Sequence, residues 1–172
     1  MEQDNQQIYI GRQPILDRKC NLVAFELLFR SSGEKDAQVT DDVIATATVI
    51  SNVIGSLDIN DVLGKHKGFL NFDTVLLKSD IIELLPQDRV VFELLETIHI
   101  DAGIIARCKQ LKERGFTLAL DDFLTFRDEF IPVLGLVDIV KVDIMPLSRE
   151  EIKETVTQLK KWPVKLLAEK VD

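Results

Sequence analysis

Five short apolar runs in the chain each end on a polar residue able to hold a cation or a phosphate. The runs alternate with helix-length amphipathic stretches, which is typical of βα units around a parallel sheet. In a β/α barrel the carboxyl ends of the strands converge on one mouth, where active sites lie. We therefore expect the polar residues to form one oxygen-rich cup. The runs are Gly68–Asn71, Val90–Glu93, Leu118–Asp122, Ile139–Lys141 and Leu166–Glu169.

The length of the chain limits this fold. Its 172 residues, 46% of them hydrophobic, are enough to bury one core, which predicts one domain over residues 8–172. A complete β/α barrel has about 250 residues, and the last strand candidate here runs into the C-terminus. We therefore expect an α/β fold, namely a modified TIM-like β/α barrel truncated before its last strand. The polar residues 1–7 are expected to be disordered.

The charge balance disfavours two classes of partner. The chain has 29 acidic and 21 basic residues and a formal net charge of −8. Such a charge opposes binding to a nucleic acid polymer or to an anionic membrane. No apolar run has the roughly 18 residues of a membrane span, and no cationic, apolar leader opens the chain. We expect a cytoplasmic protein, in which Cys20 and Cys108 are free thiols.

The order of expected elements departs from a plain barrel at its start. Strands at Ile8–Ile15 and Leu22–Phe29 are joined by a turn short enough for a hairpin, which predicts an antiparallel pair. The stretch Phe123–Leu136 is ambiguous, because Pro132 opposes a long helix. Further strands are expected at Gly68–Phe72, Val90–Leu95, Thr117–Asp122, Asp138–Val142 and Val164–Ala168. A helix is expected from a Thr40 cap to Gly55, and a short helix after the Gly68–Phe72 strand that stops near Pro86. Two more are expected at Ala102–Arg114 and from the Ser148/Glu151 capping box to about Lys161.

The polar residues at the strand ends have two interpretations. A single carboxylate there often only caps the next helix. Several together, in buried strands, are costly unless a cation compensates them. Such oxygen ligands suit Mg²⁺ or Mn²⁺ rather than zinc, and two such ions would clamp a phosphodiester. Lys141 would add a point charge at the same mouth, whereas His66 and His99 are expected to be solvated surface residues. The ligand set is Asn71, Glu93, Asp121, Asp122 and Glu169.

The motifs of the chain resemble those of EAL domains in kind and in order. The resemblance covers nearly the whole chain, and the combination is far more specific than any one motif. The matching segments are Arg12–Ile15 for Gln-Pro-Ile, Phe25–Arg30 for Glu-Ala-Leu with Leu in place of Ala, Asn71 for Asn-Leu-Ser, Phe92–Glu96 for Glu-x-x-Glu, Asp121–Phe123 for Asp-Asp-Phe, Lys141–Asp143 for Lys-x-Asp and Ala168–Glu169 for Ala-Glu-Gly-Val-Glu.

This resemblance implies a modified β/α barrel that hydrolyses cyclic di-GMP, a bacterial second messenger, to linear pGpG. The family uses two Mg²⁺ or Mn²⁺ ions. The resemblance implies metal ligands at Glu26, Asn71, Glu93 and Asp121, with Asp122 as a bridging ligand. It further implies that Lys141 holds the nucleophilic water with help from Glu169, that Gln13 and Arg30 contact the dinucleotide, and that Glu96 braces the loop after Asp-Asp-Phe.

Three departures from the family pattern leave alternatives open. The loop Leu124–Glu129 replaces Gly-x-Gly-Tyr-Ser-Ser, although glycine adopts backbone conformations closed to Leu or Phe. Lys170 occupies the position of a glycine, and the final strand with its substrate-contacting Gln is missing. The leading alternative is a weak or inactive EAL domain that acts as a cyclic di-GMP receptor or a protein-interaction module. An unrelated metal-dependent barrel enzyme, such as an aldolase-class lyase, is the third.

Two features predict further assembly. The opening segment Ile8–Ile15 resembles the subgroup in which an EAL domain precedes an HDOD signalling domain, which implies a C-terminal HDOD domain in the parent protein. The strand at Lys165–Val171 is expected to have an open edge with exposed apolar side chains, a template for pairing with another chain. We therefore expect either a homo-oligomer or a chain whose own rearranged terminus fills the gap left by the missing strand, and in both cases weak binding of cyclic di-GMP.

Overall fold

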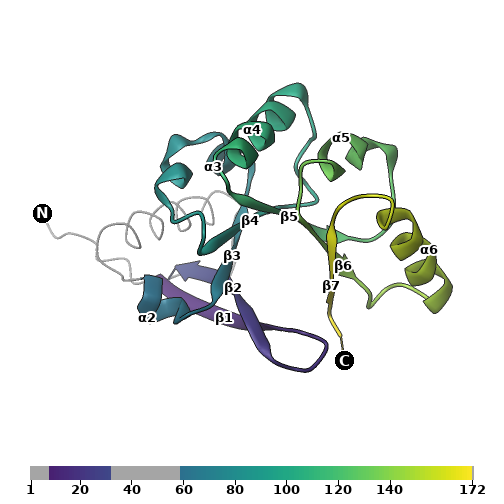
Figure 1. Cartoon of the computed structure of the whole chain (residues 1–172), viewed down its shortest axis with the longest axis horizontal. Coiled ribbons are helices and arrows are strands. Elements are labelled where there is room, and N and C mark those ends of the chain that lie inside the picture. The colour runs from purple at the N-terminus through teal and green to yellow at the C-terminus, as the bar shows by residue number, and fades with distance from the viewer. Residues whose placement is uncertain (1–7, 32–58, 172) are drawn as a thin grey trace, which may run out of the picture. The chain divides into compact units, whose positions relative to one another are not determined.

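The computed structural model describes residues 8–31 and 59–171. In these residues, seven strands are hydrogen-bonded in the order of the chain and form one mixed sheet (Figure 1). The chain forms two compact units, one with residues up to 70 and 79–90, the other with 71–78 and the residues from 91 onward. Residues 1–7 and the helix expected from Thr40 to Gly55 lie outside the described residues. No helix in the described ranges is both long and apolar enough to cross a bilayer.

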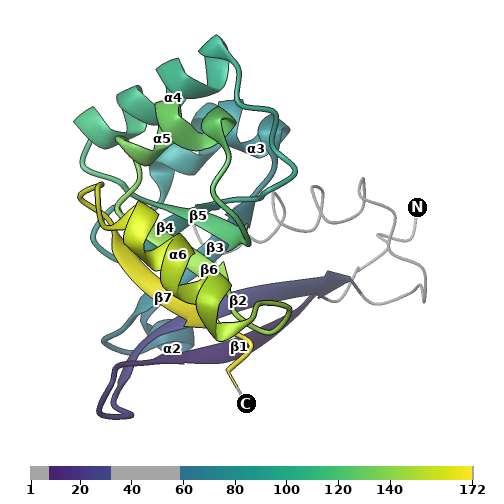
Figure 2. The same cartoon turned by 90° about the vertical axis from the view of Figure 1, so that its right-hand side faces the viewer.

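The first unit begins with the expected antiparallel hairpin. β1 (Ile8–Leu16) pairs with β2 (Leu22–Ser31), and the two strands form one long ribbon (Figure 2). In the connecting turn, Asp17 Oδ1 accepts hydrogen bonds from the backbone N–H of Lys19 at 2.7 Å and of Asn21 at 2.9 Å. An Asp side chain that bonds the following backbone in this way favours a tight turn. β2 then pairs in parallel with the next strand, so the chain reverses strand direction at this hairpin.

A short helix that the sequence analysis did not predict precedes the third strand. α2 (Ile59–Leu63) is followed by Gly64, whose φ of +56° suits glycine. β3 (Lys67–Phe72) passes close to it. A Cβ on Gly68 would lie 2.9 Å from Leu63 Cδ1, so glycine permits this approach. Arg89 also secures the region, because its guanidinium donates to Asn60 Oδ1 at 2.6 Å and to the carbonyl of Gly64 at 2.5 Å.

The second unit contains parallel strands that alternate with helices, as predicted. Neighbouring strands from β4 to β7 all pair in parallel, so their carboxyl ends share one edge of the sheet. The strands are β4 (Val90–Leu94, from Val91 in this unit), β5 (Thr117–Phe123), β6 (Ile139–Asp143) and β7 (Lys165–Glu169). The helices are α3 (Thr74–Lys78), α4 (Ala102–Glu113), α5 (Ile131–Leu134) and α6 (Arg149–Leu159), with a 3₁₀ turn η2 (Asp128–Phe130); a second turn, η1 (Asp80–Leu84), belongs to the first unit.

Aromatic side chains form the core beneath β4. The Phe92 ring lies 4.5 Å from that of Phe72 and 4.8 Å from that of Phe116, measured between ring centroids. All residues of β4 are buried, which explains why this strand is a continuous apolar run apart from Glu93. Cys108 is buried in α4 and Cys20 is exposed, and both are free thiols as expected.

The helix boundaries follow their capping residues. Ser148 and Glu151 form the expected capping box, with hydrogen bonds of 3.3 Å and 2.8 Å, and α6 then ends at Leu159 rather than near Lys161. The ambiguous stretch Phe123–Leu136 contains the 3₁₀ turn η2 and the short helix α5. Pro132 lies in the first turn of α5, where its missing N–H has no helical partner to lose.

The expected α/β class and the antiparallel first pair are therefore confirmed. Of the two histidines, His99 is exposed as expected. His66 is half-buried instead, and its ring packs edge-on against that of Phe25 with 5.9 Å between centroids. The expectation of a solvated His66 was therefore wrong, because neither this ring contact nor the helix α2 that precedes it was predicted.

Candidate metal and phosphodiester site

Lys141 lies at the centre of three carboxylates at the shared edge of the second unit's strands. Its Nζ is 2.5 Å from Glu93 Oε1, 2.7 Å from Asp121 Oδ1 and 2.9 Å from Glu169 Oε1. The four residues come from β6, β4, β5 and β7, at or near the carboxyl end of each strand. The side chains of Lys141 and Glu93 are 1% and 0% exposed. The sequence placed these residues together correctly, and we call them the Lys141 cluster.

Electrostatics keep this cluster charged. Burial by itself would lower the pKa of Lys141, but the attraction of Glu93 and Asp121 outweighs it and raises that pKa above its ordinary value. Lys141 is therefore an ammonium ion in this structure. Its charge offsets part of the repulsion among three carboxylates that burial would otherwise make costly.

Asn71, at the end of β3, adds an amide to the Lys141 cluster. With its nitrogen turned toward the carboxylates, it donates to Glu93 Oε2 at 3.2 Å and to Asp121 Oδ2 at 3.3 Å. In the opposite orientation its oxygen faces the same two carboxylate oxygens, which is favourable only with a cation among them. The amide of Asn71 therefore suits the cluster with or without a metal ion.

A second charged group adjoins the first. Lys170 Nζ lies 2.5 Å from Asp143 Oδ2 and 3.1 Å from Asp122 Oδ1. The hydrogen bonds that it donates to Asp143 and Asp122 raise the pKa of Lys170, and its bond to Asp143 lowers the pKa of that carboxyl. Ligand atoms of Asp121, Asp122 and Glu169 all lie within 4.8 Å of one another. Asp122 therefore belongs to both groups.

Asp143 and Lys170 were not predicted as site residues. Asp143 follows Lys141 by two positions, so both side chains point to the same face of β6. That spacing was visible in the sequence and would have identified Asp143. For Lys170 the available signal was that it occupies the position of a family glycine, which agrees with its backbone φ of +54° in the left-handed region that favours glycine. That signal does not indicate what the lysine side chain contacts.

The remaining predicted site residues lie elsewhere. Gln13 and Glu26 are direct partners in the β1–β2 register of the first unit, where Gln13 is exposed and Glu26 half-buried. Arg30 pairs with Tyr9 through the same ladder, and its side chain is outside the described part of the chain. Glu96 is exposed in the loop after β4. Their expected roles in ligand binding and loop bracing stay predictions.

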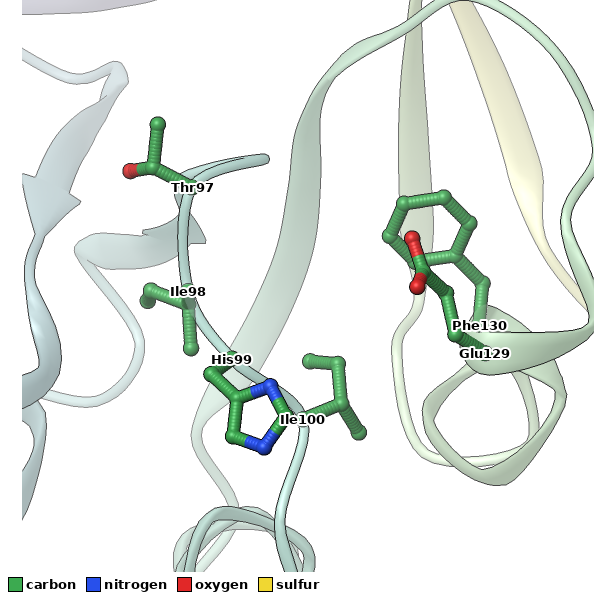
Figure 3. Close-up of a pocket in the computed structure, with 6 residues that line it drawn as sticks. All are labelled: Thr97, Ile98, His99, Ile100, Glu129 and Phe130. Atoms are coloured by element: carbon green, nitrogen blue, oxygen red, sulfur yellow. The ribbon is translucent and has the colours of Figure 1, made fainter.

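A small pocket is lined by none of the residues of the Lys141 cluster or of the group around Lys170. It has a volume of about 230 Å³, below the roughly 300 Å³ at which ligand pockets begin. Figure 3 shows the loop after β4 on one side and η2 on the other. None of the residues predicted to hold a metal ion lines this pocket, so it is not the candidate site. Its lining residues are Thr97, Ile98, His99, Ile100, Glu129 and Phe130.

Two curated proteins are similar to the chain in sequence. The chain is 33% identical over 169 residues, 96% of its length, to the uncharacterized protein YuxH of Bacillus subtilis. It is 35% identical over 150 residues, 86% of its length, to the cyclic di-GMP phosphodiesterase CdgJ of Vibrio cholerae. It spans 41% of the length of YuxH and 34% of that of CdgJ. No protein-family model matches the chain.

Solved EAL structures have the same fold. The EAL enzyme Bd1971 with cAMP and cyclic di-GMP bound has a TM-score of 0.69 and 14% identity, over 96% of this chain and 55% of that one. YkuI of Bacillus subtilis, with an EAL domain in complex with cyclic di-GMP and calcium, has a TM-score of 0.67 and 16% identity, over 96% of this chain and 49% of that one. The EAL domain of Mycobacterium smegmatis DcpA has a TM-score of 0.68 and 16% identity, over 94% of this chain and 80% of that one. The chain therefore has the EAL fold, and its similarity to CdgJ supports its recognition as an EAL domain.

Proposed function

We propose that the chain hydrolyses cyclic di-GMP to pGpG at the Lys141 cluster, with the help of Mg²⁺ or Mn²⁺. The main observation is a buried lysine held by three carboxylates at the ends of neighbouring parallel strands. Sequence similarity to a cyclic di-GMP phosphodiesterase and fold similarity to structures with bound cyclic di-GMP support the choice of substrate.

The donor atoms suit hard divalent ions. The cluster and its neighbour Asp122 offer carboxylate and amide oxygens, without sulfur or imidazole, and such sets favour Mg²⁺ or Mn²⁺. YkuI was solved with calcium, which is also a hard cation. Bound ions of this kind lower the pKa of a water molecule and polarise a phosphodiester. The proposed ligands are Glu26, Asn71, Glu93, Asp121 and Asp122.

The protein's own residues are proposed to orient the attacking water, to accept its proton and to bind the dinucleotide. Because the pKa of Lys141 is raised, its ammonium stays protonated and donates a hydrogen bond that orients the attacking water. Glu169, whose Oε1 is 2.9 Å from that ammonium, is proposed to help hold this water and to accept its proton. Gln13 and Arg30 are proposed to contact the dinucleotide, and Glu96 to brace the loop after β5.

The test combines turnover with metal binding. Purified protein should release pGpG from cyclic di-GMP only when Mn²⁺ is present, and Mn²⁺ should raise its melting temperature. Asp121→Ala, Asn71→Ala and Glu26→Ala should lose both effects, by about 100-fold or more in rate for Asp121→Ala. Glu150→Gln, an exposed carboxylate on α6, is the matched control and should behave like wild type. Equal stabilisation of Asp121→Ala and wild type by Mn²⁺ would rule out the metal assignment.

Binding without turnover is the second candidate function. It is favoured by Lys170, which pairs with the proposed bridging ligand Asp122, and by the loop Leu124–Glu129, which lacks the family's glycines. In that case the protein binds cyclic di-GMP in calorimetry yet releases no pGpG with Mn²⁺. An aldolase-class lyase, the third alternative, would show no preference for a guanine dinucleotide. The HDOD domain and the homo-oligomer stay predictions.

A further inference from the structure

Lys170 differs from the other cations near the site in what it contacts. Its Nζ forms ion pairs with Asp143 and Asp122, at 2.5 Å and 3.1 Å. Lys141 pairs instead with the three carboxylates of the Lys141 cluster. The two groups together have five carboxylates and two ammonium ions. Lys141 pairs with the carboxylates of the first group, and Lys170 pairs with those of the second. Asp122 is the carboxylate that both groups share, because its ligand atom also lies within 4.8 Å of those of Asp121 and Glu169.

The backbone conformation of Lys170 directs its side chain toward Asp122 and Asp143. Residue 170 directly follows β7 and has a φ of +54°, which turns the chain immediately after Glu169. A non-glycine residue in the left-handed region is strained. Hydrogen bonds to Asp143 and Asp122 offset that strain, so the side chain and the turn support each other. The side chain of Lys170 is 45% exposed, whereas that of Asp143 is 9% exposed.

We propose that Lys170 acts as a tethered cation that competes with a divalent ion for Asp122, so that the site holds one ion tightly instead of two. This inference rests on the proposed metal-dependent function. An ammonium ion neutralises a carboxylate as a metal ion does, but it accepts no lone pair and cannot activate a water molecule. Lys170 would therefore preserve the charge balance of the site while weakening the two-ion clamp on the phosphodiester. The chain would then favour binding of cyclic di-GMP over its hydrolysis.

The test measures metal binding by calorimetry, without turnover. Wild-type protein titrated with Mn²⁺ should bind one ion per chain. Lys170→Gln should bind a second ion, with an apparent dissociation constant for that ion at least about fivefold lower than in wild type. Lys170→Arg keeps the charge and should resemble wild type. Lys153→Gln, which removes one exposed positive charge on α6, controls for the change in net charge.

The outcomes separate this inference from the proposed function. Two tight Mn²⁺ ions in wild type, or one ion in both wild type and Lys170→Gln, would overturn the role of Lys170 and leave metal-dependent hydrolysis possible. An equal gain in Lys153→Gln would reduce the effect to net charge and also overturn it. No Mn²⁺ binding by any variant, all of them folded by circular dichroism, would overturn both the tethered cation and the metal-dependent function.

Discussion

At the scale of residues, the site is organised by two lysines of different character. Lys141 is fully buried and has three carboxylate partners, so its charge is part of the fold. Lys170 is nearly half exposed and bonds two carboxylates at the rim. Removal of a buried partner leaves uncompensated charge, whereas exposed pairs contribute little. We therefore expect Lys141 to govern stability and Lys170 to govern occupancy by metal ions.

The role of Lys141 can be measured by denaturation. Lys141→Met should reduce the free energy of unfolding in EDTA by about 3–5 kcal/mol, because three carboxylates lose their common countercharge. Lys112→Met should cost about 0–1 kcal/mol, since its pair with Asp138 is partly exposed, at 31% and 38%. Saturating Mn²⁺ should recover part of the loss in Lys141→Met. Equal losses for the two variants in urea titrations would show that the cluster does not depend on the buried ammonium.

The Lys141 cluster could be predicted from the sequence, whereas the contacts of Lys170 could not. Strand ends predicted Glu93, Asp121, Lys141 and Glu169 as neighbours, because parallel strands bring their carboxyl ends to one edge. Lys170 was noted only as a replacement of a family glycine; its φ of +54° agrees with that glycine, but the contacts of its side chain were not predicted. Whether a lysine competes with a metal ion depends on distances of 2.5 Å and 3.1 Å that only the fold supplies.

At the scale of elements, strands were predicted within one or two residues. The short helical stretch before Pro86 was also predicted and is present as α3 and η1, whereas α2 and α5 were not predicted. Alternating apolar runs mark each strand, and the capping box marks α6. α2 and α5 have five and four residues, too few for a helical period to emerge. The loop between β5 and η2 is similarly unmarked. None of residues 124–129 has a positive φ, so this loop does not use the conformations that the family's glycines permit.

The loop can be tested by restoring those glycines. Leu124→Gly with Phe126→Gly should raise the affinity for cyclic di-GMP or Mn²⁺, because glycine opens backbone conformations closed to Leu and Phe. The same change should cost about 1–2 kcal/mol in stability, since glycine increases the entropy of the unfolded chain. Leu124→Ala with Phe126→Ala removes the side chains without this freedom and serves as the control. Calorimetry in which the folded glycine variant gains neither affinity nor turnover would point to another cause.

At the scale of the whole molecule, the fold follows from the order of βα units, and the residues proposed as ligands come from both compact units. Glu26 and Gln13 belong to the first unit, and the Lys141 cluster to the second. The strand order also leaves β7 with one neighbour, β6, in the described residues. Its Leu166 is 37% exposed, and Val171 just beyond it is 66% exposed. A strand edge with exposed apolar side chains favours pairing with another chain.

We therefore predict that this 172-residue chain self-associates through β7. Light scattering should give a mass above that of the 19.5 kDa monomer, increasing with concentration. Leu166→Lys should restore the monomer, because a charge on an edge strand opposes pairing with a second chain. Val75→Lys replaces an apolar side chain that is 66% exposed on α3, away from the edge, and should leave association unchanged. If wild type stays monomeric at high concentration, or if Val75→Lys dissociates it as well as Leu166→Lys does, the edge of β7 is not the contact between copies.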